Sequence, residues 1–488
     1  MYSRILGLIA LMSIGVAHAV VAAELVVLTP MTTGTEVVMR AGPKGEKPAP
    51  ILRRAPDNAV TKSVLREATR GSIKFMLDLD EYAQRISGAK TAPTYLSMSR
   101  EAGGFARRNF WLAVGDKFVW HTDPYVDLAV DNQSIADGSF EEEFAHEMGH
   151  VLLHRVLPRF PSGMSRAPHS SLAVTDYPTA FDEGFAIHFQ GLARQITTNP
   201  QLQAYDDGFA FKPFVAYWAS DLDRAFRLRG MRDDLFIHLQ LPVALQVGDA
   251  TSLFDLTHFK NGQQMMASEG VIATLFYHLQ LRVPDKPEDL LNRYKSLLHS
   301  LRALNSERIQ SGTPIFLNLV QAHIQRVPQA RNAWVGTVLD LTYGATASTS
   351  VIRGMTNLSA LGQEGKRDEY VAALKRSRAT LATLTANVVR DPKRLSAALG
   401  SELWLGVKRK DGDVETINLN TAEQTGLTDV LGFETGAVNL LLADRATGGP
   451  FKDVADFATR RGLSADVANR LAAAQALAHL VGDYDRQN

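Results

Sequence analysis

The chain has 488 residues, of which 45% are apolar, so it can build a sizeable core and more than one domain. Lys plus Arg equals Asp plus Glu at 52 each, so no overall field would attract nucleic acid or an anionic membrane. The sequence has no cysteine, which excludes a disulfide framework and a lipid anchor on cysteine.

The N-terminus resembles a targeting segment. Arg4 precedes an apolar run at 5–16, and two small-residue cleavage patterns follow at 17–19 and 21–23. This order is typical of a secretory signal peptide, which is removed before folding. We therefore expect a signal peptide at 1–23 and a mature chain that lies in the periplasm or outside the cell, without a membrane span. An uncleaved N-terminal anchor is the alternative.

Residues 24–135 are expected to form an α/β lobe. A Pro-, Lys- and Gly-rich loop at 43–50 and a helical pattern at 60–86 interrupt several runs of β-forming residues. The β-rich runs lie at 24–29, 109–114, 118–120 and 125–130. The last run precedes the motif described next and is a candidate edge strand for an extended ligand, although an ordinary buried strand fits it equally well.

The sequence His146-Glu147-Met148-Gly149-His150 is an H-E-x-x-H pattern. Ser139 followed by Glu142 predicts a capping box, and an apolar stripe after it predicts a helix that carries the pattern. Residues four apart lie on one face of a helix, so the two imidazoles can bind one Zn²⁺ ion. Glu147 then lies beside the metal as a general base. The alternative is a structural role for the two histidines.

A third protein ligand has to come from another segment. His154 is eight residues beyond His146, about 12 Å along the helix, which is too far to share the metal. The best candidate is Glu183, at the start of an expected second helix that follows a loop at 158–178. Asp182 is the adjacent alternative and Glu269 a more distant one, and both acids at 182–183 also suit a helix N-terminus.

These residues resemble the gluzincin metallopeptidases, in which a Glu on a downstream helix, often in a Glu-Gly-x-Ala setting, completes a two-His, one-Glu zinc site. The resemblance covers His146 to His150 and Asp182 to Ala186. The separation of 33 residues from His150 to Glu183 exceeds that of the best-known branches, and Ile187 stands where a further acid is common, so the subfamily stays open.

Residues 136–345 are expected to form a mainly helical zinc-peptidase lobe that contains the motif and an amphipathic segment at 270–281. A peptidase also needs a donor to stabilise the oxyanion, and Tyr277 and His278 are the candidates, although each fits a core or surface position of its helix as well. The polar segment at 346–413 is expected to be a helical linker.

The last 70 or so residues resemble the helix-hairpin-helix domain of the bacterial competence-protein type. Several short motifs between Ile417 and Leu463 carry the resemblance by their order and spacing, and two of them are the hairpins Leu431-Gly432-Phe433 and Arg461-Gly462-Leu463. In such domains the hairpin amides hold a DNA phosphate. Here Glu434 and Ser464 replace the second glycine of each hairpin, and residues 414–488 have six Lys or Arg against ten Asp or Glu. DNA binding is therefore disfavoured, and a role in packing or in docking a protein partner is expected instead.

The expected fold class is α+β, with an N-terminal α/β lobe, a helical zinc-peptidase lobe and an all-α helix-hairpin-helix domain at 414–482. The expected function is an exported zinc metallopeptidase acting on a peptide or protein substrate. The alternatives are a DNA-binding protein that uses the tail and a catalytically inactive scaffold that binds little zinc.

Overall fold

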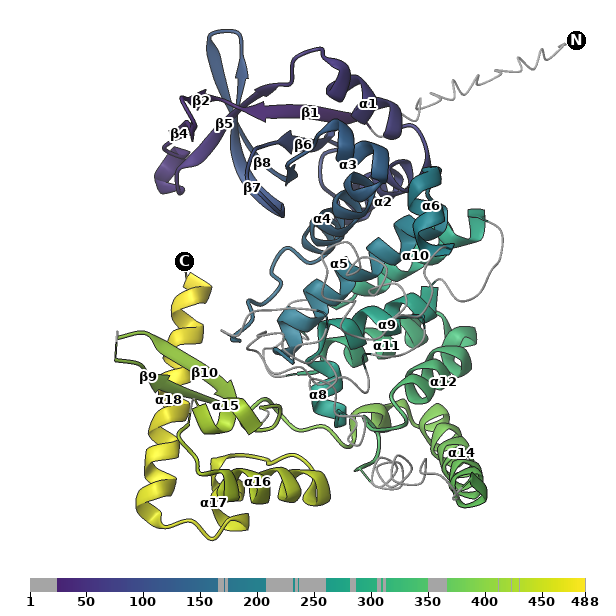
Figure 1. Cartoon of the computed structure of the whole chain (residues 1–488), viewed down its shortest axis with the longest axis vertical. Coiled ribbons are helices and arrows are strands. Elements are labelled where there is room, and N and C mark those ends of the chain that lie inside the picture. Colours follow the sequence, from purple (N-terminus) through teal and green to yellow (C-terminus); the bar gives the residue numbers. More distant parts are fainter. Residues whose placement is uncertain are drawn as a thin grey trace, which may run out of the picture.

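The computed structural model has three parts, a sheet lobe, a helical lobe and a C-terminal tail, in that order along the chain (Figure 1). The structure describes residues 24–165, 171, 174–207, 231–232, 236, 260–280, 287–304, 309, 313–349, 367–410, 412–422, 424–429 and 431–487. The expected signal peptide at 1–23 and part of the linker at 346–413 lie outside the described residues.

The sheet lobe contains a six-stranded mixed sheet in the order β1-β6-β8-β7-β5-β4. Its strands are β1 (Leu25–Pro30), β4 (Met39–Arg40), β5 (Ala49–Arg54), β6 (Thr94–Met98), β7 (Gly104–Val114) and β8 (Lys117–Leu128), and β2 (Thr32–Thr33) pairs with β3 (Glu36–Val37) as a separate ribbon. β7 and β8 form a long antiparallel hairpin that turns at Gly115, where φ is +59°. Helices α1 (Ala59–Glu67) and α2 (Gly71–Ser87) connect β5 to β6.

Three details of this lobe differ from the sequence-based expectation. The helical pattern at 60–86 is two helices, because the chain breaks before Gly71, which has a φ of +56°. The runs at 118–120 and 125–130 belong largely to one strand, β8. β8 is also not an edge strand, since its last four residues pair with β6 on one side and with β7 on the other.

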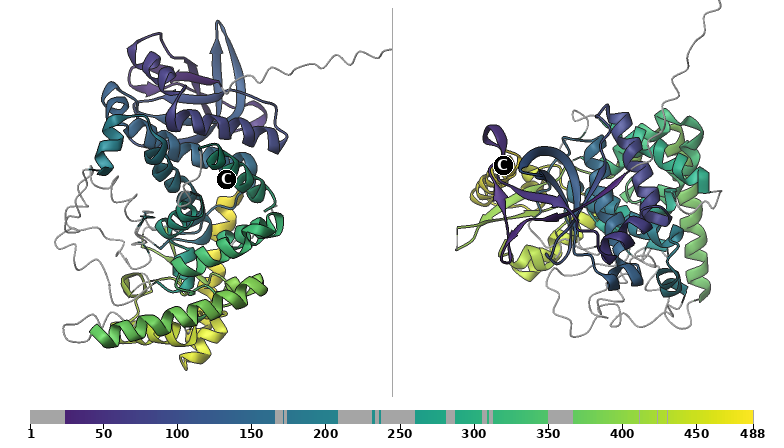
Figure 2. Two further views of the ribbon diagram at one scale, coloured as in Figure 1. Left: turned by 90° about the vertical axis from the view of Figure 1, so that its right-hand side faces the viewer. Right: turned by 90° about the horizontal axis from the view of Figure 1, so that it is seen from above.

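The helical lobe is built around two adjacent helices, α4 (Ser139–Val156) and α5 (Tyr177–Ile196). Helix α2 packs on α4, and α9 (Glu269–Gln280) packs on α5, so that one hydrophobic core runs from the sheet through the helices. The other elements are α3 (Asn132–Asp137), α6 (Pro200–Asp207), α8 (Gly262–Met266), α10 (Pro287–Arg302), α11 (Ile315–Arg326), η5 (Pro328–Ala330), α12 (Arg331–Leu341), α14 (Arg367–Arg390) and η6 (Pro392–Ser396). The sheet and α14 lie at opposite ends of the molecule (Figure 2).

The start of α4 differs from the expected capping box. The N-cap is Gly138, at a φ of +82°, and no side chain caps the helix. Ser139 Oγ donates to Asp137 instead, and Glu142 accepts a hydrogen bond from Arg194 at 2.5 Å. Glu141 and Glu142 are both buried, because they connect α4 to α2 and α5. Glu142 therefore bonds to a distant residue of α5 and does not form the capping box with Ser139.

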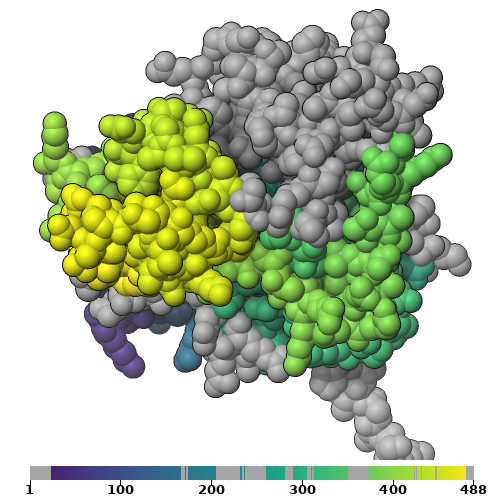
Figure 3. All heavy atoms as spheres, turned by 90° about the horizontal axis from the view of Figure 1, so that it is seen from below, coloured from purple at the N-terminus to yellow at the C-terminus, as the bar shows by residue number. Residues whose placement is uncertain are grey.

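The sequence predicted an all-α tail, but the tail also contains two strands. Strands β9 (Trp404–Lys408) and β10 (Val414–Asn418) form an antiparallel hairpin, and β9 lies in the segment expected to be a helical linker. Four helices follow, α15 (Gln424–Asp429), α16 (Thr435–Gly448), α17 (Val454–Arg460) and α18 (Ala465–Gln487). The hairpin packs against α18, and the tail has a hydrophobic core of its own. On the side away from the sheet, the tail and α14 are distinct masses (Figure 3).

The tail also contacts the first turn of α5. Glu402 Oε1 accepts a hydrogen bond from the backbone N of Tyr177 at 3.0 Å, and Thr416 Oγ1 donates to the backbone O of Met164. Trp404 and Met164 pack together in a small apolar cluster with Ala478. Met164 and Tyr177 are therefore both in contact with the tail.

Candidate metal centre

Helix α4 presents His146 and His150 on one face, one turn apart. Their Nε2 atoms are 3.3 Å apart, and the rings meet at 75° with centroids 5.0 Å apart. Two unprotonated imidazole nitrogens would repel each other at this distance because each presents a lone pair, so either one nitrogen carries a proton that it donates to the other or a cation lies between them. The i, i+4 spacing of the sequence motif has produced the pair that the helix geometry predicts.

Glu183 reaches this pair from α5. Its Oε2 lies 3.5 Å from His146 Nε2 and 3.6 Å from His150 Nε2. A tetrahedral ion with bonds of about 2.0–2.1 Å holds neighbouring ligand atoms about 3.3–3.4 Å apart. The three observed separations are close to that value, and these side chains form the one group of possible metal ligands within the described part of the chain. Two His and one carboxylate that leave a fourth position open are a typical donor set for catalytic zinc.

Small residues bring the two helices close enough for this contact. A Cβ at Gly149 would lie 2.8 Å from the Cα of Ala186, which is closer than real Cβ atoms approach. On the opposite side of α5, a Cβ at Gly184 would lie 2.6 Å from the Cβ of Ile272 on α9. The glycines of the two motifs and Ala186 therefore set the depth at which α5 packs, and so the reach of Glu183.

Asp182 contacts the other nitrogen of His150. Its Oδ1 lies 2.6 Å from His150 Nδ1, which leaves Nε2 directed at His146 and Glu183. Carboxylates in this position orient metal-binding histidines and raise their basicity. Asp182, the adjacent alternative for the third ligand, thus lies behind His150 and not in the group of three.

Glu147 lies beside the group and is only 7% exposed. Burial raises its pKa to about 7; His150 lowers it, whereas the neighbouring carboxylates raise it further. A carboxylate poised near neutral pH can take up a proton and release it again, as a general base requires. Strand β7 lies opposite Glu147. A Cβ added at Gly104 of this strand would lie 2.6 Å from Glu147 Oε1. A larger residue at this position would force the Glu147 carboxylate to move.

The charge of His150 depends on the same neighbours. Burial alone would lower its pKa, but Asp182 and two nearby glutamates outweigh that effect and raise the pKa to about 10. Without a metal, the surrounding carboxylates therefore favour the protonated form of His150. A divalent cation would bring its own charge to the same point, where the surrounding carboxylates favour it.

The other predicted residues lie elsewhere. Tyr277 and His278 are buried on α9, where His278 Nε2 contacts the backbone O of Met231 at 2.8 Å. Glu269, the distant alternative, is buried at the start of the same helix and does not belong to the group of three. Tyr277 and His278 thus occupy core positions, the second of the two readings that their sequence allowed.

The sequence did not reveal the strand edge at this site. The first half of β7, Gly104 to Arg108, pairs with β8, whereas β5 pairs with β7 only at Trp111 and Leu112. Among the described residues, one edge of 104–108 therefore has no strand partner, and it begins beside Glu147. The Gly103-Gly104 pair before a β-rich run was the available signal, because glycine in a strand often marks a close approach.

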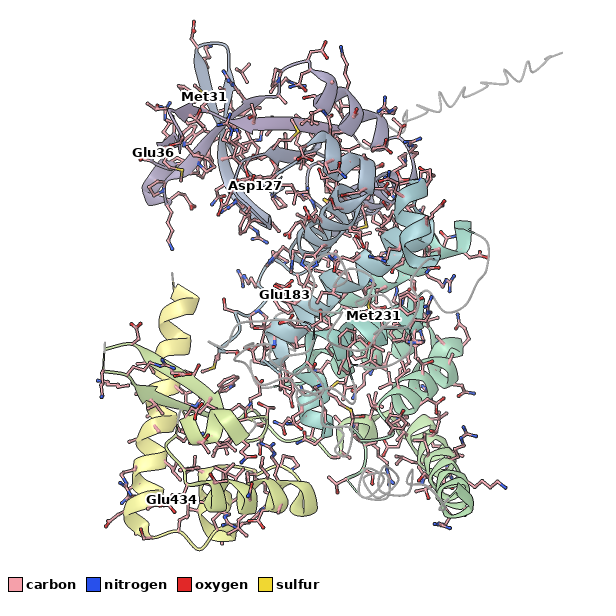
Figure 4. All side chains as sticks on the ribbon, viewed as in Figure 1. Met31, Glu36, Asp127, Glu183, Met231 and Glu434 are labelled. Atoms are coloured by element: carbon pink, nitrogen blue, oxygen red, sulfur yellow. The ribbon has the colours of Figure 1, made fainter. Side chains whose placement is uncertain are left out.

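The hairpins of the tail have the expected geometry. Gly432 and Gly462 adopt φ values of +65° and +57°, which favour glycine. Glu434 is the N-cap residue of α16, and Ser464 precedes α18. Glu434 lies at the end of the tail farthest from Glu183, so the hairpin is remote from the candidate metal centre (Figure 4).

Comparison with known families identifies the tail alone. Residues 415–488 match the family model described as a helix-hairpin-helix motif, so the C-terminal domain belongs to this type. The chain has no significant match among curated proteins or among solved structures. Within the described residues, no helix is both long and apolar enough to cross a membrane.

Proposed function

We propose that this protein is an exported zinc metallopeptidase. The observation that carries the proposal is the separation of 3.3 to 3.6 Å among His146 Nε2, His150 Nε2 and Glu183 Oε2. Those three side chains would hold the ion, and the buried carboxylate of Glu147 lies next to them. Zinc in such a site activates a water molecule and polarises the carbonyl of the substrate.

The residues of the chain then divide the remaining work. Glu147 takes the proton of the attacking water and passes it to the leaving amine, for which a pKa near neutrality is suited. Asp182 keeps the ring of His150 oriented through Nδ1. An extended peptide would add to the free edge of β7 at 104–108, so that main-chain hydrogen bonds hold it beside Glu147.

The test is a comparison of metal content and hydrolysis. Purified wild-type protein should contain about one zinc per chain and cleave unstructured peptides or casein, and a chelator should abolish cleavage. Glu147→Gln should retain the metal and lose the activity. A protein that binds no zinc, or one that cleaves peptides equally well after chelation, would overturn the proposal and favour the inactive scaffold.

The tail is proposed as a packing and protein-docking module. Its match to the helix-hairpin-helix motif is compatible with DNA binding. However, Arg445 is buried on the backbone carbonyls of Leu419 and Ala422, and Arg460 and Arg461 form ion pairs within the tail. Half of the six cations at 414–488 are therefore already engaged, and little charge remains for phosphates.

A further inference from the structure

A pocket of about 310 Å³ lies between the β7–β8 hairpin and the last turns of α4. This volume falls at the lower end of the range of small-molecule and side-chain sites. Its lining residues come from β7, β8 and α4: Ala106, Arg107, Arg108, Pro124, Val151 and His154.

The pocket lies farther along β7 and α4 than the candidate metal centre. Gly104 faces Glu147, and side chains two apart on a strand share a face, so Ala106 and Arg108 face α4 as well. On α4, Val151 and His154 lie one and two turns beyond Glu147. The pocket is therefore about 7 to 13 Å from Gly104 along the strand, at roughly 3.3 Å per residue.

The polar side chains of the pocket are all nitrogen bases, a guanidinium or an imidazole. Arg108 is exposed, keeps its charge at any ordinary pH, and forms no ion pair or hydrogen bond among the described residues. His154 adds a half-buried imidazole, whereas Ala106, Pro124 and Val151 form apolar walls. An accessible guanidinium above short apolar walls suits a carboxylate on a short aliphatic stem.

The charged residues near Arg108 already have other partners. Arg107, next along the strand, is held by Asp127 at 2.8 Å and by Glu101 at 2.6 Å. Partial desolvation of its guanidinium and the positive charge of Arg155 lower the pKa of Arg108, whereas the carboxylate of Asp182 raises it. However, the carboxylate of Asp182 already contacts His150 Nδ1 at 2.6 Å. Arg108 is thus available to a ligand.

We propose that this pocket binds a carboxylate of the substrate, two to four residues along the chain from the bond that is cleaved, with Arg108 as the residue that determines the preference. The carboxylate belongs either to a Glu or Asp side chain or to the C-terminus of a short peptide. The inference rests on the proposed function, because it assumes a peptide paired with the edge of β7.

The experiment uses zinc-loaded full-length protein and matched peptides. Each pair differs by Glu or Gln at one position within four residues of the cleaved bond, and each peptide is made with a free and with an amidated C-terminus. One charge-assisted hydrogen bond corresponds to a preference of ~10-fold or more in kcat/KM, expressed mainly in KM. Arg108→Gln should reduce the preference to within ~3-fold, chiefly by raising KM for the acidic peptide.

Two control variants make the result specific. Arg53→Gln removes one positive charge from β5, outside the pocket, and should leave the preference unchanged. Arg108→Lys keeps the charge but loses the two-pronged geometry, and should restore part of the preference. A preference that disappears on amidation assigns the carboxylate to the C-terminus, and one that survives amidation assigns it to the side chain.

The two proposals fail in different ways. Cleavage of the Glu and Gln peptides at equal rates, or a preference that survives Arg108→Gln, would overturn the pocket proposal. Either result would leave the peptidase proposal standing. If no peptide is cleaved, the peptidase proposal fails, and the pocket is judged by fluorescence anisotropy of labelled peptides on the Glu147→Gln protein. In that assay, equal affinity for the acidic and neutral peptides overturns the pocket as well.

Discussion

Gly149 and Ala186 are in direct backbone contact: a Cβ added at Gly149 would lie 2.8 Å from the Cα of Ala186. The contact joins the helix that carries His146 and His150 to the helix that carries Glu183. A methyl group at this point would push the helices apart. The distance between Glu183 and the two imidazoles therefore depends on a residue outside the proposed donor set.

Gly149→Ala should consequently weaken zinc binding and lower the free energy of unfolding by ~1–3 kcal/mol, as overpacking does. Gly336→Ala is the matched control, since Gly336 lies inside helix α12 with nothing within 4 Å of the added Cβ. That control should be neutral or stabilising. Urea unfolding and a competitive zinc titration measure both effects. Equal zinc affinity in the two variants would mean that α5 adjusts without cost.

Glu147→Gln distinguishes the role proposed for Glu147, a general base, from the role proposed for the metal ligands. We expect near-stoichiometric zinc and a loss of peptidase activity of at least ~100-fold, because the amide cannot accept the proton of water. His146→Ala and His150→Ala should lose both zinc and activity, since two protein ligands rarely hold the metal. Metal analysis and a peptide assay decide the matter. Substantial activity in Glu147→Gln would show that another group acts as the base.

Asp182 and Glu183 should differ in their effect on zinc. Glu183→Ala removes a side chain 3.5 Å from His146 Nε2 and should weaken zinc most. Asp182→Asn keeps the shape but weakens the contact to His150 Nδ1, and should cost ~10–100-fold in affinity. Far-UV circular dichroism should stay near that of the wild type in both variants. A larger loss in Asp182→Asn would assign the third ligand to Asp182.

His188 makes stability depend on pH. The side chain is completely buried on α5, where burial lowers its pKa from 6.5 to about 3. The unfolded chain therefore binds a proton between pH 6.5 and 3 that the folded chain does not, so its contribution to stability is present above pH 6.5 and is lost towards pH 3. His188→Phe should lower the slope in this range by up to ~1.4 kcal/mol per pH unit.

Urea unfolding of both proteins, freed of metal with a chelator, measures these slopes. Phenylalanine suits the position because His188 already stacks on Phe276, with centroids 5.0 Å apart. Parallel slopes for the wild type and His188→Phe would mean that the imidazole becomes protonated in the folded state.

The tail should not bind DNA at physiological salt. Glu434 places a carboxylate at the N-cap of α16, where the hairpin amides would otherwise hold a phosphate. Full-length protein should show no mobility shift with a short duplex, and Glu434→Gly alone should add little, because Arg460 and Arg461 stay paired within the tail. Micromolar binding that weakens steeply with salt and strengthens in Glu434→Gly would favour the nucleic-acid function.

The sequence by itself determined the features that depend on neighbours in the chain. His146 and His150 share a face because a helix returns every 3.6 residues, and that relationship needs no tertiary contact. The hairpin of the tail was likewise predictable, since Gly432 and Gly462 adopt the left-handed turns that favour glycine. In both cases the pattern and the geometry it specifies lie within a few residues.

Only the tertiary structure decided which distant segments meet. Neighbouring acids point about 100° apart on a helix, so the packing of α5 on α4 sends Glu183 to both Nε2 atoms and Asp182 to Nδ1. Strand order placed the free edge on β7, because period-2 alternation shows which face is buried but not which strand lies at an edge. Arg108 belongs to the same stretch of β7, and only the folded structure brings it together with Val151 and His154 of α4.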